Sequence, residues 1–207
     1  MSKKYIWALD ISLKNTGIAI YDLEKGEFVY ISSFSTEKIR ATKEYKGLYV
    51  NGVKLKKIVD WLKEIMKVFP PKHIAIERGF SRFNTETQVL FRCHGVINCL
   101  LWQVPQEYYT PKTIKAEILH GDASKDDVRK QILSVYPNLE ITNEDESDAV
   151  AILLTYLIKE GLIKYEKPEK PIKKKKKKVV KDVVESEDGE VEIDEKTLNL
   201  VKAMKDN

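Results

Sequence analysis

Cysteine is scarce in this sequence, with only two among 207 residues. Cys93 and Cys99 lie six residues apart in one expected helix, so their side chains point to different sides and cannot easily form a disulfide. No CxxC pair is present, which argues against a zinc site. No apolar run is long enough to span a bilayer, and no signal peptide precedes the first strand-like segment. We therefore expect a soluble protein without a membrane partner, in a reducing compartment.

Glycine is also scarce, with nine residues and no glycine-rich loop. Actin-like and sugar-kinase-like ATPases begin with a strand, an aspartate and a glycine-containing hairpin, as this sequence does. They then need later glycine-rich loops that hold phosphate and adenosine. Because such loops are lacking here, an ATPase of this kind is the less favoured alternative, and a measurement of ATP binding tests it.

Charged residues are abundant and unevenly placed. They make up 33% of the chain, with a formal net charge of +4, a mildly basic balance that is compatible with a nucleic-acid partner. From Glu166 onward, two prolines and the lysine run 173–178 are followed by an acidic stretch. We expect residues 1–165 to form one domain and residues 166–207 to be a charged, disordered tail.

Short β-prone runs come first and helical patterns follow. We expect strands over 5–10, 17–21, 28–34, 73–77 and 104–109, and helices over 53–69, 85–102, 111–119, 124–136 and 145–159. The first three strands are spaced closely enough for an antiparallel meander. This order predicts an α/β fold with a five-stranded mixed sheet flanked by helices, which is the element order of the ribonuclease H fold.

Four acidic residues occupy positions at which α/β proteins place ligands. Asp10 and Glu77 each end an expected strand, while Asp145 and Asp148 share one face at the start of a helix. Taken singly, each has an ordinary structural role: an aspartate suits a turn, and the helical pair suits a helix start capped by Thr142 or Asn143. Together, carboxylates that converge repel each other unless divalent cations bind, so the combination predicts a metal site for phosphodiester hydrolysis.

These motifs resemble those of the RuvC family of Holliday-junction resolvases, within the ribonuclease H-like nucleases. The resemblance covers roughly residues 5 to 160. It rests on the segments Ala8-Leu9-Asp10 with Thr16-Gly17, Ile74-Ala75-Ile76-Glu77, and Asp145-Glu146-Ser147-Asp148-Ala149. The family's usual Pro-Gly-Ser after the first aspartate is replaced by Ile11-Ser12-Leu13, and the basic segment 35–49 and the tail also differ. These departures indicate a divergent member, of a phage or virus type, acting in the cytoplasm of a bacterium or of a phage-infected host cell.

The resemblance implies roles for further residues. Lys115 and Lys125 match basic residues near the scissile phosphate, and Phe80 matches an aromatic that wedges into the junction. It also implies two Mg²⁺ ions per active site, for which Mn²⁺ substitutes, held by the four acids. A homodimer, with its contact on the helix over 85–102, would nick two opposed strands of a four-way junction. Expected phosphate contacts are Arg78, Arg82, Lys38, Arg40, Lys43 and Lys46.

Two further alternatives keep the fold but change the activity. The chain could be a nuclease for other branched DNA or for RNA–DNA hybrids, which a panel of labelled substrates would separate. It could also be a catalytically idle junction-binding protein, although the presence of all four acids argues against that interpretation.

Overall fold

The computed structural model describes residues 4–79 and 84–168, with the side chains of 84–86 excepted. Its sheet has the strand order β3-β2-β1-β4-β5. The first two pairings, β3 with β2 and β2 with β1, are antiparallel, and β1–β4 and β4–β5 are parallel. The strands are β1 (Tyr5–Asp10), β2 (Asn15–Asp22), β3 (Glu27–Ser35), β4 (Pro71–Glu77) and β5 (Gln106–Tyr109). The predicted meander and five-stranded mixed sheet are confirmed.

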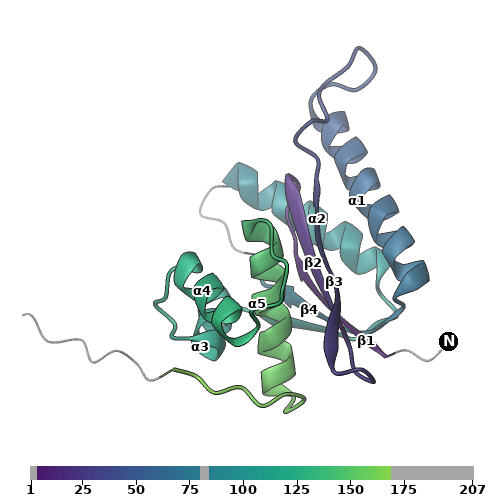
Figure 1. The fold of residues 1–207 in the computed structure, drawn as a ribbon. Coiled ribbons are helices and arrows are strands. Elements are labelled where there is room, and N and C mark those ends of the chain that lie inside the picture. Colours follow the sequence, from purple (N-terminus) through teal and green to yellow (C-terminus); the bar gives the residue numbers. More distant parts are fainter. Residues whose placement is uncertain (1–3, 80–83, 169–207) are drawn as a thin grey trace, which may run out of the picture. The chain divides into compact units, whose positions relative to one another are not determined.

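Helices cover both faces of this sheet (Figure 1). They are α1 (Leu48–Val68), α2 (Asn84–Leu100), α3 (Pro111–Ile118), α4 (Lys125–Val135) and α5 (Glu144–Lys159). Buried residues of α1 and α2 form one apolar cluster with one face of the sheet. Residues of α3, α4 and α5 form a second cluster with the other face. The domain therefore has two cores separated by the sheet, as alternating strand and helix patterns require.

Alternation along β1 and β4 decides which side chains meet which helices. Trp7 and Leu9 belong to the core beneath α1 and α2. Ile6, Ala8 and, on β4, Ala75 belong to the core beneath α5. Successive side chains of a strand point to opposite faces. Asp10, two residues after Ala8, therefore also faces α5.

Most element boundaries differ from the prediction by one or two residues, and the start of the first helix differs by five. The first helix begins at Leu48, five residues before Val53, because its N-cap is Gly47, which offers no capping side chain, and the apolar Leu48 and Tyr49 of its first turn are exposed and so do not follow the pattern of its buried face. The fifth strand begins at Gln106 rather than at residue 104, since Pro105 has no N–H to give to a ladder. Cys93 is buried and Cys99 is exposed, and both are free, as expected.

Two other expectations concern the ends of the domain and the membrane. Residues 164–168 form neither helix nor strand, and the remainder of the expected tail, 169–207, lies outside the described residues. The boundary at residue 165 stays a prediction. Over residues 4–79 and 84–168, none of the helices is both long and apolar enough to cross a bilayer.

Candidate active site

Asp10 and Glu77 are the last residues of two neighbouring parallel strands. Leu9 of β1 is in register with Ile76 of β4, so the two acids follow at the same edge of the sheet. Both lie two residues beyond an alanine that faces α5, namely Ala8 and Ala75, and they therefore face α5 as well. The fold places these two sequence-predicted acids side by side.

The start of α5 lies against the same edge. Gly17 of β2 pairs with Asp10 in the antiparallel ladder. A Cβ atom at Gly17 would lie 2.1 Å from the backbone oxygen of Asp145, and 3.4 Å from the Cβ of Ala149. The absence of a side chain at Gly17 thus allows the first turn of α5 to touch β2 next to Asp10. Asp148, one turn after Asp145, comes with it.

A polar network anchors the first turn of α5. Asn143 is the N-cap, as one of the two expected caps, and its side-chain oxygen accepts from the Glu146 N–H at 3.0 Å. The buried Glu146 carboxylate accepts from the backbone and the hydroxyl of Thr142, at 2.7 and 2.8 Å. The Asn143 amide donates to the Ser33 hydroxyl of β3 at 2.8 Å. The sequence did not predict that Ser33 and Glu146 position α5. The one available signal was that Glu146 follows the N-cap Asn143 by three residues, as in a capping box.

Electrostatics show that the four acids act on one another. Burial, followed by the charges of Asp148 and Glu77, raises the pKa of Asp10 from 3.8 to about 8. Burial and the charge of Asp148 raise the pKa of Glu77 to about 6. Burial and Asp148 also raise the pKa of Asp145. Carboxyl groups with raised pKa values of this kind need additional positive charge nearby to be ionised together.

Two sequence-predicted lysines supply part of that charge. Lys125, the first residue of α4 after the Ser124 cap, forms an ion pair with Asp148. Its charge also lowers the pKa of Asp10 and of Glu77, although it does not outweigh burial. Lys115 of α3 is partly buried and lowers the pKa of Glu77 in the same way. Lys125 therefore contacts the acids directly and Lys115 acts on them through its charge, although the two lie on separate helices.

The donor set suits a hard divalent cation, because the converging groups are carboxylate oxygens without cysteine or histidine among them. Within residues 4–79 and 84–168, no three acidic, histidine or cysteine side chains are already close enough to ligate one ion. That the four acids together bind metal therefore stays a prediction.

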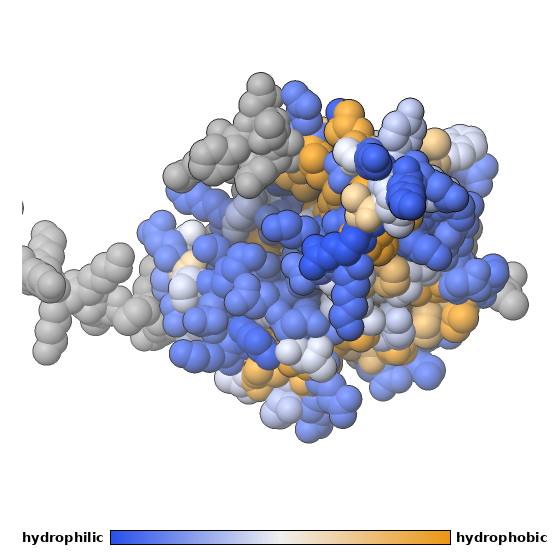
Figure 2. All heavy atoms as spheres, turned by 90° about the horizontal axis from the view of Figure 1, so that it is seen from above, coloured by the Kyte–Doolittle hydropathy of each residue, from blue (hydrophilic) through white to orange (hydrophobic). Residues whose placement is uncertain are grey.

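Of the residues expected to contact DNA, those in the described part of the chain are exposed. Arg78 follows Glu77 and is exposed. The segment between β3 and α1 carries exposed Lys38, Arg40, Lys43 and Lys46. Phe80 and Arg82 lie outside the described residues. Figure 2, which looks down on the end where α5 begins, shows hydrophilic residues over most of this face, with hydrophobic ones between them.

The raised pKa of Asp10 predicts how pH changes the stability of the metal-free protein. The folded chain keeps a proton on Asp10 that the unfolded chain releases, so this contribution is complete below pH 3.8 and is lost as pH rises through about 8. The Asp10→Asn variant lacks it. In EDTA, we expect the variant to gain stability relative to wild type by about 2 kcal/mol as pH rises across this window, a value reduced for partial solvent exposure. Denaturant unfolding at several pH values measures it, and a pH-independent difference would contradict it.

Comparison with known proteins agrees with this geometry. The family model described as crossover junction endodeoxyribonuclease RuvC matches residues 6–156. The RuvC of Rickettsia bellii (strain RML369-C) is 28% identical over 162 residues, which cover 75% of this chain and 98% of that protein. The RuvC of Idiomarina loihiensis is 25% identical over 164 residues, covering 77% of this chain and 90% of that protein.

Solved structures show the same fold. The T. thermophilus RuvC in complex with Holliday junction substrate has a TM-score of 0.60 at 18% identity, over 77% of this chain and 97% of that one. The yeast mitochondrial Holliday junction resolvase Ydc2 has a TM-score of 0.52 at 13% identity, over 76% of this chain and 80% of that one. The ribonuclease H-like fold predicted from the element order is confirmed. With a family match across most of its described residues, the chain belongs to the RuvC family of metal-dependent crossover junction endodeoxyribonucleases.

Proposed function

We propose that this chain resolves Holliday junctions and related branched DNA by nicking two opposed strands. One observation carries the proposal: Asp10 and Glu77 end adjacent parallel strands on the face against which Asp145 and Asp148 are packed. Membership of the RuvC family supports the reaction type. The T. thermophilus relative, whose structure includes a Holliday junction substrate, supports the choice of DNA.

The four carboxylates would hold the metal, and the oxygen-only donor set fits two Mg²⁺ ions, with Mn²⁺ as a substitute. When bound, divalent ions at such a site activate water and stabilise the leaving oxygen. The residues of the chain then have distinct tasks. Asp10, between Glu77 and the start of α5, is central to the cluster. Lys125 and Lys115 stand beside the acids and can stabilise negative charge on the phosphate that is cut.

Paired nicking requires two active sites, which a symmetric homodimer provides, since a four-way junction is itself nearly two-fold. We propose that α2 makes the dimer contact, as its sequence predicted. Its exposed Phe91 supports this assignment, because a large apolar side chain that is 58% accessible on a helix gains by being covered. The reaction would take place in the cytoplasm.

A substrate panel tests the proposed function. Wild type is incubated with Mg²⁺ and a mobile four-way junction, a flap, a fork, an RNA–DNA hybrid or linear duplex of matched length. We expect the junction to be cut at symmetric positions at least about 10-fold faster than duplex, with no cutting by Asp148→Asn. Equal rates on junction and duplex would contradict the junction preference. Cutting of the hybrid alone would favour the alternative nuclease.

A further inference from the structure

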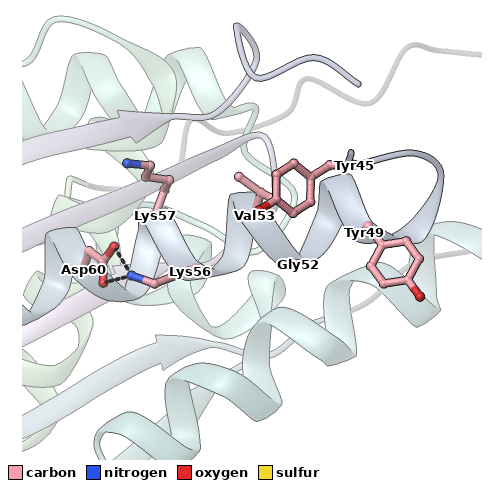
Figure 3. A pocket seen from close by; sticks show the side chains of 7 residues that line it. All are labelled: Tyr45, Tyr49, Gly52, Val53, Lys56, Lys57 and Asp60. Atoms are coloured by element: carbon pink, nitrogen blue, oxygen red, sulfur yellow. Dashed lines mark hydrogen bonds and ion pairs between the residues drawn. The ribbon is translucent and has the colours of Figure 1, made fainter. Parts of the chain in front are cut away.

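A hollow outside the active site is walled by two tyrosines (Figure 3). Tyr45, from the segment before α1, and Tyr49, from its first turn, are 46% and 74% exposed. The hollow is also lined by Gly52 and Val53 and, farther along α1, by Lys56, Lys57 and Asp60. Exposed apolar side chains that gather in one place with polar residues at the rim mark an interaction site.

The structure fixes the backbone that carries the first of these rings. The Tyr45 N–H donates to the Thr42 hydroxyl at 3.1 Å, and the Thr42 N–H donates to the Tyr45 carbonyl at 2.9 Å. These reciprocal bonds close a tight turn that presents Tyr45 beside α1. A ring on a fixed backbone loses less conformational freedom when it binds than one on a mobile loop.

The floor of the hollow is kept open by Gly52. A Cβ atom there would meet nothing within 4 Å, so no packing demands a glycine. A glycine inside an exposed helix costs about 0.5–1 kcal/mol relative to alanine. Its position between the two tyrosines leaves room for a flat group.

Positive charge connects this hollow with the catalytic end of the sheet. A neighbouring hollow is lined by Lys14, Arg40, Lys54 and a single acid, Glu37. Lys14 lies in the turn that follows Asp10, and Lys54 follows Val53 of the tyrosine hollow. From Lys38 to Lys57 the chain carries seven basic residues and one acidic residue. A phosphate backbone leaving the active site would therefore meet cations along its way to the tyrosines.

We propose that the tyrosine hollow binds an unpaired nucleotide of a DNA strand that leaves the active site. Its base stacks on Tyr45 and Tyr49, while Lys57 and the basic residues of the neighbouring hollow hold the flanking phosphates. Stacking on aromatic rings beside a basic groove is how proteins bind single strands without regard to sequence. The inference rests on the proposed function for the direction of the strand, and it assigns to this chain a preference for branched DNA with unpaired nucleotides next to the branch.

Binding without cleavage tests the inference separately from the proposed function. In EDTA, full-length wild type and the Tyr45→Ala/Tyr49→Ala variant are titrated with labelled oligo-dT, with an abasic oligomer of the same length, and with duplex. We expect the variant to bind oligo-dT about 10-fold or more weaker than wild type. Its affinity for the abasic oligomer and for duplex should change less than about 2-fold, because the charges are intact.

Three variants sharpen the result. Tyr45→Phe/Tyr49→Phe should retain the binding of oligo-dT, since it keeps both rings. Gly52→Leu should lose it while keeping or raising the melting temperature, because leucine favours the helix and fills the hollow. Trp102→Ala, which removes a 73% exposed ring elsewhere, is the matched control and should bind as wild type does.

Equal loss on oligo-dT and on the abasic oligomer would overturn the inference, as would unchanged binding by the alanine variant or by Gly52→Leu. If junctions are cut but the tyrosines have no effect, the inference alone fails. If the tyrosine dependence is found but no junction is cut, the proposed function fails and the nucleotide site stands.

Discussion

Replacing Asp10 with asparagine is expected to lower the rate of junction cleavage by about 10³-fold or more. Burial and the charges of Asp148, Glu77 and Asp145 raise the pKa of Asp10 to about 8, so its carboxylate lies within the electrostatic influence of the other three acids. Asparagine keeps the shape but removes the charge on which cation binding depends. Single-turnover cleavage with saturating enzyme measures the change in the chemical step.

Binding of Mg²⁺ gives a second measurement on the Asp10→Asn variant. Mg²⁺ should raise the melting temperature of wild type and raise that of Asp10→Asn much less, since a ligand stabilises only the fold that binds it. Asp126→Asn is the matched control: this residue lies in the first turn of α4, is exposed, and should leave both readouts unchanged. An Asp10→Asn protein that cuts at the normal rate would remove Asp10 from the active site.

The second large effect is expected from a single methyl group. Gly17→Ala would place a Cβ atom 2.1 Å from the Asp145 backbone oxygen, a distance at which one of the two backbones must move. We expect a loss of about 3 kcal/mol in the free energy of unfolding, as for other overpacked cores. Because the displaced first turn of α5 carries Asp145 and Asp148, cleavage should also fall by about 10²-fold, even at temperatures where the variant is folded.

Gly52→Ala is the control for stability. Its added Cβ would meet nothing within 4 Å on the exposed side of α1, so this variant should gain about 0.5–1 kcal/mol. Denaturant unfolding of both variants compares the two glycines directly. If Gly17→Ala were as stable as wild type, the close approach of α5 to β2 would be contradicted.

Much of the fold was predictable because its elements are locally encoded. The β-prone run that ends in Asp10 and the buried run that ends in Glu77 each carry their own strand signal, and Ser124 and Asn143 mark helix starts by their capping chemistry. The start of α1 at Leu48 was missed, since no apolar period or capping side chain marks its first turn.

The sequence by itself determined the order of strands and helices, the four acids with their two lysines, and the family to which the chain belongs. Only the tertiary structure decided what these residues can do to one another. The parallel register of β1 and β4 puts Asp10 beside Glu77, and the bare Cα of Gly17 admits α5. It also decided that Tyr45 and Tyr49, unremarkable in the sequence, face one hollow. The physical reason is that local patterns fix backbone conformation, whereas distances between remote side chains follow from packing.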